Sequence, residues 1–75
     1  MIIRTITEIL KEAHFSNDLQ VLINLWNEIV KNKYHYPLSE IRFANERISE
    51  LALSVMGKDF DNGKFYYELK SQLDA

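Results

Sequence analysis

The sequence contains no cysteine, one proline and two glycines among its 75 residues. The absence of cysteine excludes disulfides and thiol chemistry, and it argues against the usual structural zinc site. The chain has only two glycines and two histidines, so it has few of the residues that form phosphate-binding loops and catalytic sites. No purely apolar stretch exceeds three residues, whereas a membrane-spanning helix needs about 20. We therefore expect a cytoplasmic protein with no cofactor, no metal ion and no membrane contact.

The length and charge of the chain limit the number of domains and the kinds of partner that we expect. Roughly 100–200 residues make one domain, so we expect residues 1–75 to form a single helical domain. Nine Lys and Arg against eleven Asp and Glu give a formal charge of -2, which disfavours nucleic acid as a partner. Six Lys against three Arg, with abundant Ile and Asn, are typical of a low-G+C bacterial or phage gene. A domain this short buries only about 60% of its unfolded surface, which favours stabilisation by a partner.

Apolar residues recur with helical spacing in the first half of the chain. Thr5 and Glu8 have the spacing of a capping box, so a first helix is expected to begin near Thr5. A second helix is expected after Ser16 or Asn17 as its cap, and it should end before Pro37. The apolar arc of this second helix covers more than half its circumference, which predicts that neighbours cover it on more than one side.

The second half predicts two further helices. Pro37 suits the entrance of a third helix, and Gly57 suits its left-handed end. For the last segment, Asn62-Gly63 is a hairpin signal, but Phe65, Tyr66, Leu69 and Leu73 have helical spacing. We favour a helix from about 62 to 73, capped by Asp61 or Asn62. The sequence thus predicts an all-α fold, a small antiparallel bundle of three to four helices.

No motif for catalysis or metal binding is present. The acidic stretch 59–63, with Glu68 beyond it, fits the calcium-loop pattern in neither register that we tried. His14, Ser16 and Asp18 are close in sequence, but they fall in a loop and a helix cap rather than on a rigid catalytic scaffold. We therefore predict no catalytic residues and a protein that is not an enzyme.

Apolar residues outside the main stripes are the more informative feature. They are Val21, Leu25, Phe43, Leu53 and Tyr67. Aromatic and aliphatic anchors that converge on one surface are typical of protein interfaces. We predict that these five residues contribute to a partner-binding surface. The function expected is a small non-enzymatic protein-interaction module, an adaptor, subunit or inhibitor that binds a protein partner or itself.

The alternative is a small nucleic-acid-binding regulator. Cations and an aromatic residue gather around the junction of the second and third expected helices, namely Lys31, Lys33, Tyr34, Arg42 and Arg47. Rings that stack on bases and cations that follow the backbone make up surfaces for single strands. The salt dependence of the binding affinity distinguishes the two hypotheses. Binding through phosphate contacts weakens steeply as the salt concentration rises, whereas apolar association does not.

Overall fold

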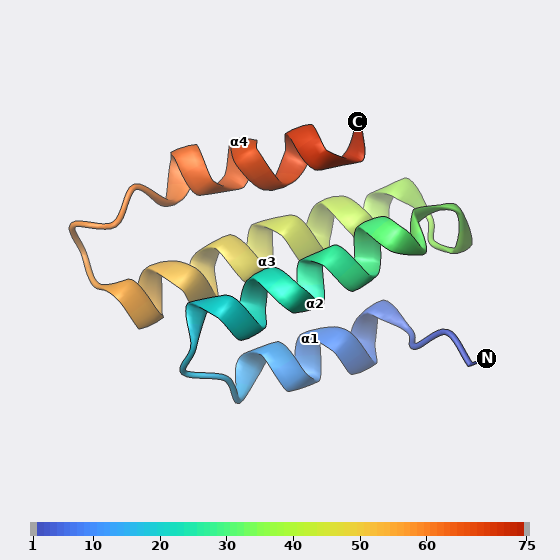
Figure 1. Ribbon diagram of the computed structural model, residues 1–75, viewed down its shortest axis with the longest axis horizontal. Coiled ribbons are helices and arrows are strands. Elements are labelled where there is room, and N and C mark those ends of the chain that lie inside the picture. The colour runs from blue at the N-terminus through green and yellow to red at the C-terminus, as the bar shows by residue number, and fades with distance from the viewer. Residues whose placement is uncertain (1, 75) are drawn as a thin grey trace.

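The computed structural model describes residues 2–74, and over that range it is an antiparallel bundle of four α-helices (Figure 1). The elements are α1 (Ile6–His14), α2 (Leu19–Lys31), the short 3₁₀ helix η1 (Lys33–His35), α3 (Leu38–Met56) and α4 (Asn62–Leu73). Successive α-helices run in opposite directions, so both ends of the described chain lie at the same end of the bundle. The predicted all-α bundle is confirmed, and the hairpin alternative is wrong because Asn62 and Gly63 open α4.

Local capping chemistry sets most helix boundaries. At the start of α1 the Thr5 hydroxyl accepts the Glu8 amide at 3.1 Å, and the Glu8 carboxylate accepts the Thr5 amide at 3.1 Å. Asp61 caps α4 by accepting the Lys64 amide at 3.0 Å. Gly57 ends α3 with a φ of 95°, a left-handed conformation that disfavours any side chain. These boundaries match the predictions.

The N-terminal cap of α2 differs from the prediction, whereas its end before Pro37 agrees with it. Its cap is Asp18, whose carboxylate accepts the Gln20 amide at 2.8 Å, while Ser16 accepts the Asp18 amide at 3.2 Å and holds the preceding turn. The helix ends at Lys31, well before Pro37, because the Asn32 side chain donates to the Glu28 carbonyl at 3.1 Å and the chain tightens into η1. In the part of the chain that the structure describes, no helix combines the length and apolar character that crossing a bilayer requires.

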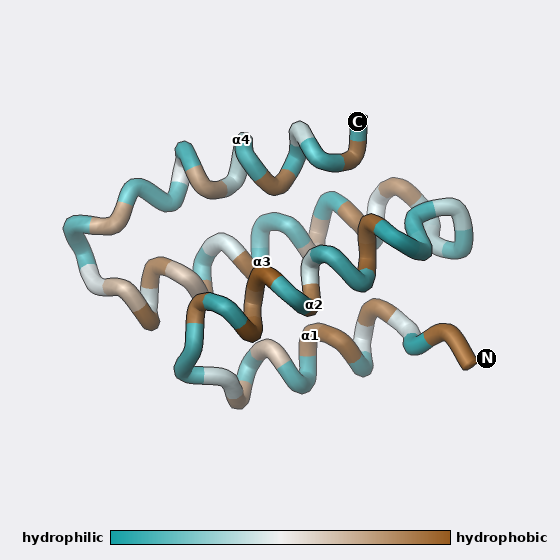
Figure 2. Tube along the Cα trace, viewed as in Figure 1, coloured by the Kyte–Doolittle hydropathy of each residue, from teal (hydrophilic) through white to brown (hydrophobic). Residues whose placement is uncertain are grey.

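The hydrophobic core lies between the four helices, each of which contributes buried residues. Figure 2 shows apolar residues recurring along α2, which contacts α1, α3 and α4. Trp26 and Ile29 are fully buried, and Leu25 is only 4% exposed. The prediction that Leu25 forms part of a partner surface is therefore wrong in this chain. The wide apolar arc of α2 is covered by three neighbouring helices, so the bundle itself uses that surface.

Polar bonds as well as apolar burial hold α4 in place. Phe65 and Leu69 are the buried residues of this helix. Three side chains from other elements donate to its carbonyl oxygens: Trp26 Nε1 to Leu69 at 3.0 Å, Asn45 Nδ2 to Tyr66 at 3.2 Å and Lys33 Nζ to Leu73 at 2.7 Å. These bonds come from α2, α3 and η1. They fix both the register and the depth at which α4 lies against the bundle.

Candidate functional site: the groove between α3 and α4

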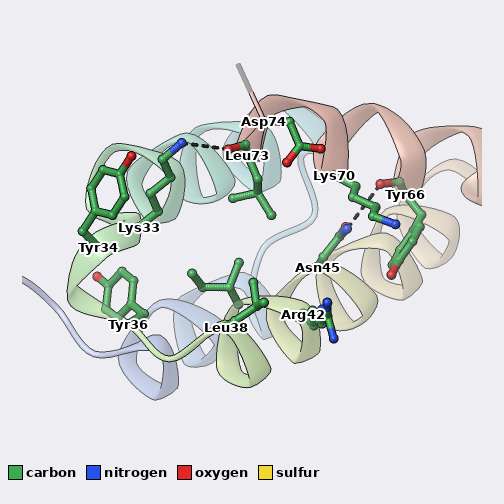
Figure 3. Close-up of a pocket in the computed structure, with 11 residues that line it drawn as sticks. Lys33, Tyr34, Tyr36, Leu38, Arg42, Asn45, Tyr66, Lys70, Leu73 and Asp74 are labelled. Carbon is green, nitrogen blue, oxygen red and sulfur yellow. Dashed lines mark hydrogen bonds between the residues drawn. The ribbon is translucent and has the colours of Figure 1, made fainter.

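A groove of about 600 Å³ opens between η1, the first half of α3 and α4 from Tyr66 onward (Figure 3). Its volume falls within the roughly 300–1,000 Å³ of cavities that bind ligands. We call it the α3–α4 groove. It is lined by Lys33, Tyr34, Tyr36, Leu38, Ile41, Arg42, Asn45, Tyr66, Lys70, Leu73 and Asp74.

The two long walls of the groove repeat the same helical spacing. The α3 wall carries Leu38, Arg42 and Asn45, and the α4 wall carries Tyr66, Lys70 and Leu73. Residues spaced by four and then three positions lie on one face of a helix. Because the helices are antiparallel and Asn45 bonds to the Tyr66 carbonyl, the register sets Arg42 across from Lys70 and Leu38 across from Leu73. In Figure 3 the side chains of Leu38 and Leu73 point toward one another.

The two cations at the middle of these walls lack carboxylate partners. Glu46 follows Arg42 by four residues and Asp74 follows Lys70 by four, yet neither forms an ion pair with that cation within residues 2–74. The ion pairs that the described residues do form belong to Arg4 and Arg47. Because both unpaired cations line one groove, an anion bound between them would be attracted by both.

Residues of η1 close one end of the groove. The Lys33 ammonium donates to the Leu73 carbonyl, which stabilises the C-terminus of α4, and lies 5.4 Å from the centroid of the Tyr34 ring. Tyr34 is 91% exposed, so one ring face is free for a ligand. Tyr36 is half-buried, and its hydroxyl donates to the Arg4 carbonyl at 2.6 Å. The η1 end is therefore tied to both the last helix and the N-terminal segment.

A smaller cavity of about 340 Å³ lies on the other side of Tyr36, beside the N-terminal segment. There the Arg4 guanidinium donates to Glu28 at 2.6 and 2.9 Å and to Glu12 at 2.6 Å. The bonds from Arg4 lower the pKa of Glu28, and they raise the pKa of Arg4 itself. Burial raises the pKa of Tyr36. Because its one cation, Arg4, is already paired with two carboxylates, this network has a structural role and offers no free cation to a ligand.

The predicted partner-binding residues do not gather at the groove. None of the five lines it. Leu25 is in the core, Val21 is half-buried against the core, and Leu53 is half-buried on α3. Phe43 and Tyr67 are 58% and 68% exposed on α3 and α4. The sequence thus identified two exposed aromatic residues correctly, but it did not identify a single surface.

The residues of the nucleic-acid alternative divide into two groups. Lys33, Tyr34 and Arg42 line the groove, whereas Lys31 and Arg47 do not. Arg47 donates to Glu50 at 3.2 Å on the exposed side of α3.

Sequence reasoning missed the contributions of Asn45, Tyr66, Lys70 and Leu73 to the groove. The one sign of the groove in the sequence is the spacing of four and then three residues that both walls share. It acquires meaning only when α3 and α4 are known to lie side by side in this register.

Comparisons of the chain with known protein families, with characterised proteins and with solved structures find no match. The groove must therefore be interpreted from its own chemistry. Within the described residues, no group of three or more His, Asp or Glu side chains is placed to hold a metal ion. The groove offers cations, tyrosines, one carboxylate and an apolar surface.

Proposed function

We propose that this chain is a small non-enzymatic interaction module that binds a protein partner through the α3–α4 groove. The observation that carries the proposal is the pair of facing cations, Arg42 and Lys70, beside an apolar surface and without carboxylate partners in the described chain. Interfaces commonly combine apolar and aromatic anchors with Arg. We expect this interaction in the cytoplasm, because small secreted domains commonly rely on disulfides and this chain has no cysteine.

Two matched substitutions test the proposal. Leu38 and Phe43 lie on the same helix and are 57% and 58% exposed, but only Leu38 lines the groove. We expect Leu38→Glu to abolish capture of the partner from an extract of the native cells, because it places a charge on the apolar surface of the groove. An acidic residue in the first turn of α3 is also compatible with folding.

Phe43→Glu is the control, and it should retain the partner at the parent level, measured by quantitative mass spectrometry of the captured proteins. Loss through Phe43→Glu with retention through Leu38→Glu would place the interface on the outer face of α3, contrary to the proposal. Equal effects of the two substitutions would also contradict it.

The second candidate is a nucleic-acid-binding regulator, which is favoured by the presence of Lys33, Tyr34 and Arg42 along the groove. With Lys70 included, the groove offers three cations. Each phosphate contact contributes about -0.7 to the logarithmic salt slope for single strands, so three contacts predict a slope near -2. Binding of an oligonucleotide with that slope, and its loss through Arg42→Glu, would favour this candidate.

A further inference from the structure

We propose that the α3–α4 groove recognises an acidic peptide segment of the partner, with one carboxylate bound between Arg42 and Lys70 and a neighbouring apolar side chain on Leu38 and Leu73. The inference rests on the proposed function and specifies the chemistry of the partner. It follows from the order of groups along the two walls, which pair leucine with leucine at one end and cation with cation in the middle.

The cations that line the groove define where the carboxylate of the peptide binds. The chain as a whole has a formal charge of -2, yet the groove is lined by three cations and a single carboxylate. Lys33 already donates one bond to the Leu73 carbonyl, whereas Arg42 and Lys70 form no ion pair within the described chain. An Arg guanidinium and a Lys ammonium on opposite walls can both donate to one carboxylate, and such charged hydrogen bonds are about twice as strong as neutral ones.

The apolar position is defined by exposure. Leu38 is 57% exposed at the start of α3, Leu73 is half-buried at the end of α4, and Ile41 is buried beneath them. Burying aliphatic surface of this kind contributes about 25 cal/mol per Å². A ligand that satisfies the groove must therefore carry an acidic and an apolar group close together, which alternating acidic and aliphatic residues of a peptide provide.

A nucleic acid fits these observations less well. A phosphate backbone needs cations along its whole path. Here Arg4 and Arg47 are occupied in ion pairs, and the groove is lined by three cations, Lys33, Arg42 and Lys70. The apolar surface next to the cations has no counterpart in a chain of phosphates.

Fluorescence anisotropy with defined probes tests the inference. The probes are a labelled dodecapeptide of alternating Glu and Leu, the same peptide with Ser for Leu, the same peptide with Lys for Glu, and a single-stranded oligothymidylate. We expect the Glu-Leu peptide alone to bind the parent protein. Arg42→Glu and Lys70→Glu should each weaken its binding by about tenfold or more, because each removes a charged donor and adds a repulsive charge. Lys58→Glu, an exposed control outside the groove, should change binding by no more than about twofold.

A charge-reversal variant distinguishes loss of the cations from loss of the fold. The double variant Arg42→Glu/Lys70→Glu should bind the Lys-Leu peptide, which requires a folded groove. The inference is overturned if the Ser peptide binds as tightly as the Glu-Leu peptide, if only the oligothymidylate binds, or if no probe binds. If the peptide experiment fails but Leu38→Glu still abolishes capture of the partner, the proposed function stands and the groove binds a partner of different chemistry. If Leu38→Glu leaves capture intact, the proposed function itself is contradicted.

Discussion

The side chain of Asn45 is a polar group in an otherwise apolar region, and its bonds explain its presence there. It is 2% exposed, donates to the Tyr66 carbonyl at 3.2 Å and accepts the Ser49 hydroxyl at 3.2 Å. A buried amide without partners would be costly, but no buried polar side-chain atom of the described chain lacks a hydrogen bond. Asn45 therefore joins α3 to α4 beneath the groove and helps to fix its register.

Asn45→Ala is expected to reduce the free energy of unfolding by about 1–2 kcal/mol, because it removes two bonds and leaves the Ser49 hydroxyl without its acceptor. Urea denaturation followed by the fluorescence of Trp26, the sole and fully buried tryptophan, measures the change. Asn24→Ala is the matched control. Asn24 is exposed and accepts from Gln20, so its loss should cost less than about 0.5 kcal/mol. Equal effects of the two substitutions would show that the buried amide does not join the helices.

Helix boundaries were predictable wherever one local signal stood alone. Thr5 with Glu8 and Gly57 each act within a few residues of themselves, so the sequence alone identified them, and it narrowed the cap of α4 to Asp61 or Asn62. The cap of α2 was predicted wrongly because Ser16, Asn17 and Asp18 are all competent caps, and the choice depends on how the α1–α2 turn closes.

The groove was not predictable from the sequence, because it depends on contacts between distant residues. Asn45 and Tyr66 are 21 positions apart, and Lys33 and Leu73 are 40 apart. The burial of Leu25 likewise depends on contacts between residues that are distant in the sequence. Helical spacing gives the width of the apolar arc of α2, but only packing decides which helices cover it.

The N-terminal segment is held to α1 and α2 by the Arg4 network, and this predicts a dependence on pH. Because the bonds from Arg4 lower the pKa of Glu28 below its ordinary value of 4.5, the folded state favours the charged carboxylate. The unfolded chain then binds the proton more readily, so the stabilisation is fully present above about pH 4.5 and is lost as the pH falls through the pKa of the folded state.

Glu28→Gln is accordingly expected to reduce the free energy of unfolding by about 0.5–1 kcal/mol at neutral pH, given the partial exposure of the pair. The difference from the parent should shrink as urea denaturation is repeated at pH values below the ordinary pKa of the carboxyl. Glu50→Gln removes the more exposed pair with Arg47 and should change stability by less than about 0.3 kcal/mol. A pH-independent effect of Glu28→Gln would show that packing, rather than charge, explains it.

The bundle taken as a whole is compact without a second copy. Its Cα radius of gyration is 11.6 Å, close to the roughly 11 Å expected for a folded chain of this length. The large exposed apolar side chains are spread over the described chain, with Phe15 after α1, Tyr67 on α4, and Leu38, Phe43 and Met56 along α3. With Leu25 in the core, the predicted self-association surface loses one of its anchors.

We therefore expect the isolated chain to behave as a monomer of 8.9 kDa in sedimentation equilibrium over a wide concentration range. Phe43→Glu should leave that mass unchanged, because Phe43 is already exposed to water in the folded monomer. Leu25→Glu is not a usable control for association, since a charge at this buried position would unfold the bundle. Tyr67→Glu is the better second variant, because Tyr67 is exposed to a similar degree on a different helix. A concentration-dependent dimer that Phe43→Glu or Tyr67→Glu dissociates would instead assign the outer faces of α3 and α4 to self-association, leaving the groove free within the dimer for an acidic partner.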